Sequence, residues 1–329
     1  MSSRSLLRIG LLGASKISRG AIITPAMQVE GVTVSCVAAR RAERASAFAR
    51  EHGIPHVESD YAALAASEKV DLVYNALPPS EHAKWSIAAL QAGKHVLCEK
   101  PFAMNAGEAR RMVDAATDSG RELIEAFHYR FHPLFERILD ILRSGEIGNV
   151  VAIEGRFNVP ISPSPGELRY DNKLGGGACM DLGCYPIHWA RTVMGSEPRL
   201  LSAEADWHES GVDVAMVTEL EFAGGVKAQL RCSMSEALPD KLDAELAVFG
   251  DGGKLIVQNP LAPHIGHELL VETADARRIE EIAGGTTYFH QLEHVMAVIA
   301  GVAKPVTGGA DAINTMRVLD AVYQCARSD

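Results

Sequence analysis

The chain has 329 residues, of which 47% are hydrophobic and 22% are charged, and its formal net charge is −10. At about 150 residues per domain, this length predicts two globular domains. An acidic chain repels phosphate backbones and anionic lipid, so neither nucleic acid nor a membrane surface is an expected partner. No apolar run reaches the roughly 20 residues needed to span a bilayer. The six cysteines form no C-x-x-C pair, which favours free thiols in a reducing, cytoplasmic compartment.

Residues 1–126 alternate short apolar runs with Ala-rich amphipathic segments. Continuous apolar strands separated by helices predict a parallel sheet covered on both faces, and right-handed crossovers make it a doubly wound α/β sheet of the Rossmann type. The expected strands are residues 7–12, 32–39, 72–77, 96–97 and 123–126, and the helices between them include residues 42–52, 82–92 and 106–119.

Residues 13–18, GASKIS, form a glycine turn between the first strand and a helix. Gly13 permits a tight turn, small residues let the backbone approach a pyrophosphate, and the helix N-terminus presents free N–H groups to the anion. The match to G-x-G-x-x-G is imperfect, because Ser15 and Ser18 replace the second and third glycines. An ordinary small-residue turn is the competing interpretation, and the flanking strand and helix favour a dinucleotide site.

Two arginines, Arg40 and Arg41, follow the second expected strand. An NAD site usually has Asp or Glu there to bind the ribose hydroxyls. A carboxylate would repel a 2′-phosphate, whereas a guanidinium binds it bidentately. The alternative, a solvated basic start of a helix, is disfavoured because helix N-termini prefer acidic residues. The sequence therefore predicts NADP, rather than NAD, as the cofactor.

Glu99, Lys100 and Pro101 follow the strand expected at residues 96–97. The carboxyl ends of parallel strands are where doubly wound sheets bind ligands. A lysine there either loses its proton through desolvation or stays charged and polarises a developing alkoxide. We therefore expect Lys100 to take part in a reaction.

Residues 127–329 show a different pattern, with consecutive strands joined by hairpin turns such as Ala223–Gly225. This predicts an α+β domain with a large, open-faced, mainly antiparallel sheet. One sheet face is expected to pack on its own helices and the other on a second subunit, in a homodimer or homotetramer. The expected strands are residues 150–157, 200–208, 214–222, 226–233, 244–249 and 254–257, and the closing helices are residues 288–300 and 310–326.

A glycine run at residues 175–177 precedes a helical stretch that contains Asp181, Tyr185 and His188. Residues four apart share one helix face, so Asp181 and Tyr185 are expected to converge. A tyrosine beside a cation can exchange a proton with a hydroxyl group. From these residues alone, burial of Tyr185 and His188 in a core is the favoured interpretation.

Five segments, in this order, make the chain recognisable. They are the glycine turn, LPPSEH at 77–82, AGKHVLCEKP at 92–101, YRFHP at 129–133 and GGGACMDLGCYPI at 175–187. They resemble the Gfo/Idh/MocA oxidoreductase family over nearly the whole chain. Inositol dehydrogenase-like members have histidine at the position of Tyr185. Tyr185 and Arg40 resemble the branch that contains glucose-fructose oxidoreductase, dimeric dihydrodiol dehydrogenase and NADP-dependent xylose dehydrogenase. Pro79 departs from the commoner pattern, in which many members have Asn.

The resemblance implies an NADP-dependent dehydrogenase that transfers a hydride to or from a hydroxyl carbon of a sugar, polyol or dihydrodiol. It implies that Tyr185 is the acid/base, that Lys100 lowers its pKa and bonds the reacting oxygen, and that Asp181 orients Lys100 or a substrate hydroxyl. The implied cofactor-binding residues are Gly13, Ser15, Lys16, Ile17, Arg40, Arg41, Leu77, Pro78, His82 and Glu99. The residues expected to face the substrate are Arg130, Arg169 and His188.

Three competing functions stay open from the sequence. His290, Glu293 and His294 match H-x-x-E-H, a reversed zinc-protease signature, but no third ligand is evident and no metal is expected. A non-catalytic NADP-binding regulator would need the cofactor pocket but not Lys100 and Tyr185. Redox-assisted glycoside cleavage would use the cofactor without a net change in NADPH.

Overall fold

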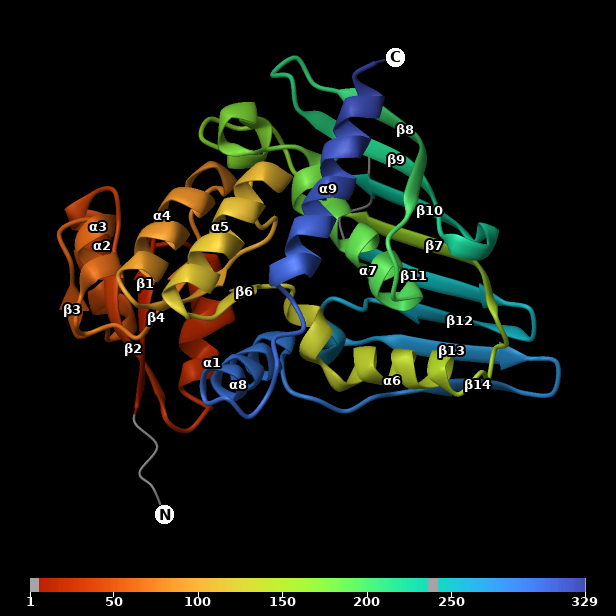
Figure 1. Cartoon of the computed structure of the whole chain (residues 1–329), viewed down its shortest axis with the longest axis horizontal. Coiled ribbons are helices and arrows are strands. Elements are labelled where there is room, and N and C mark those ends of the chain that lie inside the picture. Colours follow the sequence, from red (N-terminus) through yellow and green to blue (C-terminus); the bar gives the residue numbers. More distant parts are fainter. Residues whose placement is uncertain (1–5, 236–241, 329) are drawn as a thin grey trace. The chain divides into compact units, whose positions relative to one another are not determined.

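The computed structural model describes residues 6–235 and 242–328 (Figure 1). Its internal contacts divide the chain into two units. The first unit runs to Phe127 and also contains Tyr288–Ile313, and the second comprises His128–Thr287 and the residues from Asn314 onward. The first division lies one residue from the boundary expected after residue 126. The sequence pattern does not indicate that Tyr288–Ile313 belongs with the first unit.

The first unit contains a six-stranded parallel sheet in the order β3-β2-β1-β4-β5-β6. This order, in which the winding reverses between β1 and β4, is that of a doubly wound Rossmann sheet and confirms the predicted fold class. The strands are β1 (Leu7–Leu12), β2 (Val32–Ala38), β3 (His56–Val57), β4 (Leu72–Asn75), β5 (His95–Cys98) and β6 (Leu123–Glu125). The helices between them are α1 (Thr24–Ala26), α2 (Ala42–His52), α3 (Tyr61–Ala66), α4 (Pro79–Gln91) and α5 (Ala106–Ser119).

A late helix completes the core of the first unit. Ile9 and Leu11 of β1 are fully buried, as expected for the centre of a sheet covered on both faces. α8 (Thr287–Ile299) adds Leu292 and Val295 to the same hydrophobic cluster. The apolar stripe of this helix therefore stabilises the six-stranded sheet of the first unit, although the helix follows the strands of the second unit along the chain.

Three local features of the first unit differ from the expected elements. β3 has only two residues, both exposed, so it leaves no apolar run in the sequence. α3 is a six-residue helix that begins where the Asp60 carboxylate accepts a hydrogen bond from the Ala63 backbone N–H. The helix after the glycine turn starts with a π-helical turn, Arg19–Ile23, before α1. Pro25 lies at this point and has no N–H to donate to the ordinary helical ladder.

The second unit contains an eight-stranded sheet in the order β14-β13-β12-β11-β7-β10-β9-β8. Only the pair β7 and β10 is parallel within this sheet, which confirms the mainly antiparallel prediction. The two last strands, which have six and four residues, were not among those expected from the sequence. The strands are β7 (Val150–Asn158), β8 (Arg199–Trp207), β9 (Asp213–Glu221), β10 (Lys227–Ser233), β11 (Asp243–Gly250), β12 (Gly253–Gln258), β13 (Glu268–Thr273) and β14 (Arg277–Glu280). The longer helices are α6 (Pro133–Arg143), α7 (Cys184–Met194) and α9 (Gly309–Ala326), of which α9 passes from the first unit into the second.

Alternating side chains give this sheet two different faces. Met216 and Leu220 of β9 are buried, whereas Val217 between them is half-buried on the opposite face. α7 packs on the buried face, against β7 and β10. A Cβ atom at Gly155 of β7 would lie 3.2 Å from Cβ of Pro186, so glycine permits the close approach of α7 to the sheet.

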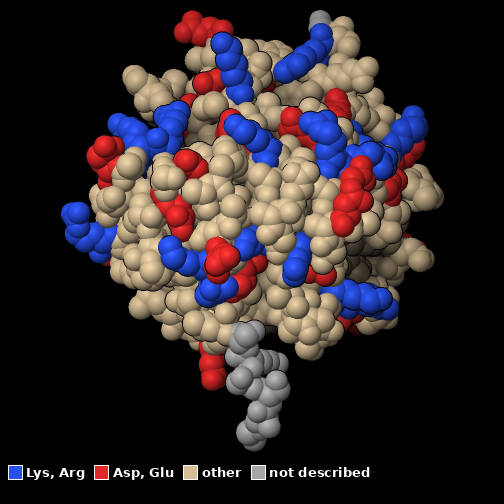
Figure 2. Space-filling model, turned by 60° about the vertical axis from the view of Figure 1, so that its left-hand side comes forward, with Lys and Arg blue, Asp and Glu red and all other residues tan. Residues whose placement is uncertain are grey.

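Among the described residues, no helix is both long enough and apolar enough to cross a bilayer. Figure 2 shows Lys and Arg side chains interspersed with Asp and Glu on the face that it presents. A phosphate backbone needs a continuous basic track, and this face does not provide one.

Candidate functional site

The glycine turn adopts a conformation that requires glycine. Gly13 has φ +94°, and its N–H donates a hydrogen bond to the Ala38 carbonyl at 2.8 Å. A Cβ atom at this position would lie 3.1 Å from Cδ2 of Leu77, in the loop after β4. The hydroxyls of Ser15 and Ser18 are 2.8 Å apart, and Ser18 is fully buried. The two serines that replace glycines therefore bond each other across the turn.

Lys16 and Ile17, at the middle of the same turn, are exposed. Their contact with a cofactor stays a prediction.

Arg40 and Arg41 lie at the carboxyl end of β2. Both residues are exposed, and neither guanidinium pairs with a carboxylate of the described chain. The Arg40 backbone N–H donates to the Tyr61 hydroxyl at 3.1 Å, and Nη2 of Arg44 donates to the Ala14 carbonyl at 3.2 Å. These two bonds tie the arginine segment to α3 and to the glycine turn. The sequence did not single out Tyr61, because α3 itself was not expected.

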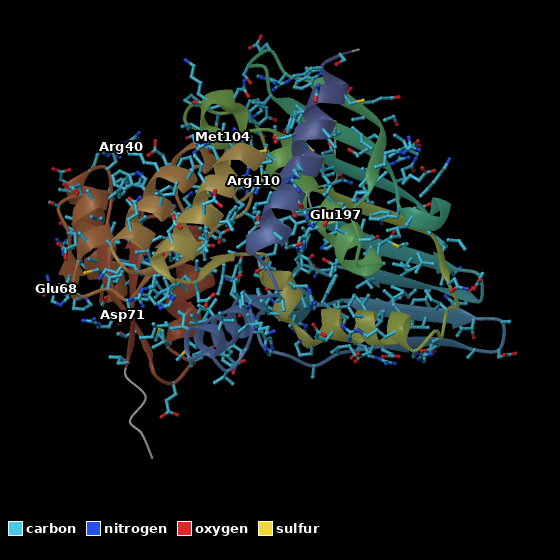
Figure 3. All side chains as sticks on the ribbon, viewed as in Figure 1. Arg40, Glu68, Asp71, Met104, Arg110 and Glu197 are labelled. Atoms are coloured by element: carbon cyan, nitrogen blue, oxygen red, sulfur yellow. The ribbon has the colours of Figure 1, made fainter. Side chains whose placement is uncertain are left out.

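Figure 3 shows Arg40 and Asp71 at opposite edges of the first unit. Arg40 follows β2 and so marks the carboxyl edge of the parallel sheet, whereas Asp71 precedes β4 and marks the amino edge. The glycine turn, the arginines and the loops after β4 and β5 all leave the carboxyl edge, where doubly wound sheets bind their ligands.

Lys100 lies in a loop whose start is anchored in the core. The Glu99 backbone N–H donates to the Asn75 carbonyl at 2.9 Å, and the Glu99 carboxylate, which is 9% exposed, accepts a hydrogen bond from the buried Tyr74 hydroxyl at 2.5 Å. The following Lys100–Pro101 peptide bond is cis. A charge-assisted bond to a buried carboxylate is strong, so the position of Lys100 at the carboxyl end of β5 is well defined.

The His82 side chain contacts both the loop after β4 and the loop after β5. Its side chain is 1% exposed, with Nε2 2.8 Å from the Leu77 carbonyl and Nδ1 3.0 Å from the Pro101 carbonyl. Burial lowers the pKa of His82 to about 4, so the ring is neutral at pH 7 and donates to one carbonyl at a time. Leu77 and Pro78 are thereby held in place, and the imidazole itself is enclosed between the two loops.

In the second unit, the structure brings Asp181 together with Arg169. Nε of Arg169 donates to the Asp181 carboxylate at 2.5 Å, and Nη1 donates to Glu167 at 3.1 Å. Asp181 lies in a π-helical turn, Cys179–Gly183, that runs directly into α7. Asp181 and Tyr185 therefore lie on a segment that changes from a π-helical turn to an α-helix, and their expected convergence stays a prediction. The sequence did not indicate Glu167.

Asp213, at the start of β9, anchors the N-terminal end of this helical segment. The carboxylate is fully buried, accepts a hydrogen bond from the Cys179 backbone N–H at 2.6 Å, and accepts a second from the Tyr323 hydroxyl at 2.6 Å. A Cβ atom at Gly177 would lie 2.2 Å from this carboxylate, which explains the last glycine of the run. Burial raises the pKa of Asp213, although both hydrogen bonds oppose the shift. No local signal in the sequence marks this residue.

Tyr185, on the first turn of α7, is 4% exposed and lies in a cluster of aromatic rings. Its hydroxyl is 3.2 Å from Nε2 of His128, and Nδ1 of His128 is 2.8 Å from Oγ1 of Thr287. The sequence interpretation missed His128 and Thr287. The position of His128, shortly after the carboxyl end of β6, was the available signal.

A second pair of the same chemistry lies beside the first. The Tyr129 hydroxyl forms a hydrogen bond with Nδ1 of His188, and both side chains are almost completely buried. His188 therefore packs inside the second unit, and its expected contact with substrate stays a prediction. Arg130 is paired with Glu136, and its guanidinium lies 5.5 Å from the ring centre of Phe135.

The described residues contain no group of three His, Cys, Asp or Glu side chains that could hold a metal ion. His290 and Glu293, from the reversed zinc-protease signature, lie 3.4 Å apart as an i,i+3 pair on α8.

Comparisons with known proteins match both units. Residues 7–127 match the model described as the oxidoreductase family, NAD-binding Rossmann fold, and residues 135–256 match the Gfo/Idh/MocA C-terminal domain. A D-xylose 1-dehydrogenase (NADP(+)) of Haloferax volcanii is 33% identical, over 98% of this chain and 98% of its own. A trans-1,2-dihydrobenzene-1,2-diol dehydrogenase of Xenopus tropicalis is 30% identical, over 96% of each chain.

Among solved structures, a 3-ketoreductase from Actinomadura kijaniata in complex with NADP and TDP-benzene superposes with a TM-score of 0.89 at 27% identity, over 97% of each chain. Forms of that protein with a tyrosine replaced by phenylalanine, or a lysine replaced by alanine, are also similar to this chain. The match of both family models and the full-length relatives agree with the two folds described above. The chain therefore belongs to the Gfo/Idh/MocA family of oxidoreductases.

Proposed function

We propose that this chain is an NADP-dependent dehydrogenase that acts on a hydroxyl carbon of a sugar, polyol or dihydrodiol. The observation that carries the proposal is that Arg40 and Arg41, at the carboxyl end of β2, are exposed and that neither guanidinium pairs with a carboxylate of the described residues. The same segment is tied to the glycine turn by the bond from Arg44 to the Ala14 carbonyl. The NADP dependence in the name of the Haloferax relative, and the NADP bound to the Actinomadura neighbour, support the same cofactor.

The residues of the first unit fit this cofactor. A Cβ atom at Gly13 would crowd Leu77, so glycine keeps the turn tight, and the turn formed with Ser15, Lys16 and Ile17 would hold the pyrophosphate. Arg40 and Arg41 would hold the 2′-phosphate. Leu77, Pro78, His82 and Glu99 would border the nicotinamide and its ribose. When bound, NADP supplies the nicotinamide that accepts or donates the hydride.

Residues of the chain itself would transfer the proton that accompanies the hydride. We propose that Tyr185 takes the proton from the substrate hydroxyl in oxidation and returns it in reduction. Lys100 assists by stabilising negative charge on the reacting oxygen and by lowering the pKa of the phenol. In the Actinomadura neighbour a tyrosine and a lysine have each been replaced, and the choice of these two residue types supports a role for Tyr185 and Lys100 in this chain.

The charges around Asp181 favour a neutral substrate. Arg169 bonds two carboxylates, those of Asp181 and Glu167, and Arg130 is already paired with Glu136. These residues offer hydrogen-bond donors and acceptors to hydroxyl groups but no surplus positive charge for a phosphate. We therefore propose a free sugar, polyol or dihydrodiol, rather than a phosphorylated one, with Asp181, Arg169, Arg130 and His188 near it.

We also propose a homodimer or homotetramer that forms through the half-covered face of the eight-stranded sheet. Ile256, Leu270 and Ile279 are in register across β12, β13 and β14, and Ile279 is 56% exposed. An apolar row on a sheet face is a suitable interface with a second copy. Light scattering after gel filtration tests this, and an Ile279→Lys variant should shift the mass toward the monomer.

The free thiols found at all six cysteines agree with a reducing compartment, which we infer to be the cytoplasm.

The test of the function is absorbance at the reduced-nicotinamide band. The protein is mixed with NADP or NAD and with a panel of aldoses, polyols, dihydrodiols and sugar phosphates. We expect a signal with NADP and a neutral substrate, and a weaker one with NAD.

Silence across the panel, combined with tight NADP binding by calorimetry, would contradict the dehydrogenase and favour the regulator. Cleavage of a glycoside without net change in NADPH would favour the redox-assisted lyase.

A further inference from the structure

Three residues from separate segments of the second unit form one hydrogen-bonded chain. Tyr185 lies on α7, His128 opens the 3-10 turn His128–Phe131, and Thr287 is the first residue of α8. The phenol oxygen is 3.2 Å from Nε2 of His128, and Nδ1 is 2.8 Å from the Thr287 hydroxyl. The side chains are 4%, 7% and 0% exposed, so bulk water does not compete freely for these bonds.

An imidazole between two hydroxyls can form a hydrogen bond with the phenol both when it is protonated and when it is ionised. With the proton on Nδ1, the ring accepts the phenol hydrogen at Nε2 and donates to Thr287. With the proton on Nε2, the ring donates to the phenolate oxygen and accepts from Thr287. The ring therefore stays neutral and bonded at both ends while one proton moves along the chain.

We propose that His128 is the positioning and proton-relay residue for Tyr185, with Thr287 as the next member of the relay; this rests on the proposed acid/base role of Tyr185. When the substrate hydroxyl gives its proton to the Tyr185 oxygen, the phenol proton moves to Nε2 of His128. The proton on Nδ1 passes to Oγ1 of Thr287, and the Thr287 hydroxyl proton passes to a water molecule that reaches it from the exposed residues 283–285 just before it in the chain. One proton leaves the substrate, one enters the solvent, and each residue keeps its proton count. Reduction runs the same steps in reverse.

The neighbouring Tyr129 and His188 pair provides an internal control. It has the same residue types and the same kind of bond, and the Tyr129 ring packs against the Tyr185 ring. The Tyr129 hydroxyl bonds His188. The Tyr129→Phe variant therefore removes a Tyr–His bond from the cluster and leaves the Tyr185, His128 and Thr287 side chains of the relay unchanged. A purely structural role for His128 would make the two variants behave alike.

The experiment compares His128→Gln with Tyr129→Phe and Tyr185→Phe. Glutamine retains a polar group near the phenol but cannot take a proton at one end and release it at the other. We expect His128→Gln to lower kcat by about 10- to 100-fold. It should also shift the pH range over which kcat rises or falls (the pH limb of kcat) and raise the solvent isotope effect on kcat. The affinity for NADP should be unchanged. Tyr129→Phe should keep the pH limb and the isotope effect of the parent.

Thr287 gives a second test should His128→Gln fail to fold. Thr287→Ser retains the hydroxyl and should retain the parent pH profile, whereas Thr287→Val should lower kcat and move the same limb. Equal behaviour of the serine and valine variants would overturn the relay.

A readout without turnover separates this inference from the proposed function. Tyrosinate absorbance of the cofactor-free protein is titrated, and the Tyr185 contribution is the difference from Tyr185→Phe. We expect His128→Gln to shift the midpoint of that contribution. An unshifted midpoint together with a parental kcat in His128→Gln overturns the relay, even if Tyr185→Phe is inactive. A fully active Tyr185→Phe would instead refute the proposed function, while a shifted midpoint would still show that His128 controls the phenol proton.

Discussion

The Asp213 carboxylate accepts a 2.6 Å hydrogen bond from the Cys179 backbone N–H, at the start of the helical segment that carries Asp181 and Tyr185. Asp213 begins β9, so this bond fixes the reactive helix to the sheet beneath it. The N–H groups at the start of a helix have no partner within it, and a buried carboxylate satisfies one of them with favourable charge. The position of Tyr185 thus depends on a residue 28 positions further along the chain.

The anchor can be tested by removing the Asp213 carboxylate. We expect Asp213→Ala to lower the free energy of unfolding by about 2–4 kcal/mol, since it leaves the Cys179 N–H and the Tyr323 hydroxyl buried without this partner. Tyr323→Phe removes one of the two bonds and should cost about 1 kcal/mol. Urea unfolding followed by circular dichroism measures both. Equal stabilities of Asp213→Ala and the parent would show that the carboxylate does not anchor the helix.

Arg40 should determine the preference between NADP and NAD. Because the guanidinium is unpaired and exposed, Arg40→Ala removes a charge-assisted contact without leaving a buried charge behind. We expect the dissociation constant for NADP to rise by about 10- to 100-fold and that for NAD to change little. Arg50→Ala, an exposed arginine at the other end of α2, is the matched control and should bind both cofactors as the parent does. A similar loss in both variants would mean a general effect of charge.

Tyr185→Phe should abolish most of the turnover while it preserves the fold. Loss of an acid/base group is expected to lower kcat by about 100- to 10,000-fold. The ring still fills its place among Phe157 and Trp189, so the thermal unfolding midpoint should change little. Steady-state kinetics and calorimetric NADP binding check the two halves of this expectation. Turnover at the parental rate would exclude Tyr185 as the acid/base.

His82 should make the fold sensitive to mild acid. Burial lowers its pKa to about 4, below the value of about 6.5 in an unfolded chain. A group with a lowered pKa in the folded state stabilises the fold above its unfolded pKa, and this contribution is lost as the pH falls from about 6.5 towards 4. The shift corresponds to about 3 kcal/mol at most.

His82→Gln should therefore flatten the dependence of unfolding free energy on pH between about 4 and 6.5. His56→Gln removes an exposed histidine of the same unit and should keep the parental slope. Chemical denaturation at a series of pH values measures the slopes. If the slope of His82→Gln equals that of the parent, His82 does not carry the acid sensitivity.

Much of the architecture is readable along the chain. The helices α2 and α5 begin and end at the predicted residues, and β1 does as well, because apolar periodicity and glycine stops such as Gly53 and Gly120 are local signals. β3, α3 and β14 were not indicated, because they are short and their residues follow no period long enough to detect. β13, which has six residues, was also not indicated.

The residues of the candidate site likewise fall into those that the sequence indicates and those that only the structure reveals. The glycine turn, Arg40, Lys100 and Tyr185 belong to short motifs whose residues are near each other in sequence. Asp213 and Thr287 act through side chains that meet their partners only after folding. Sequence patterns do not indicate such pairs, since neither residue carries a local mark of the other.

The sequence by itself determined the two fold classes, the family and the residue types at the centre of the proposed chemistry, because these depend on local periodicity and on contiguous motifs. Only the tertiary structure decided that α8 completes the first core, that Arg169 neutralises Asp181, and that the Tyr185 phenol bonds His128. The physical reason is that burial and hydrogen-bond partners are properties of side chains brought together from distant segments, and no segment specifies them alone.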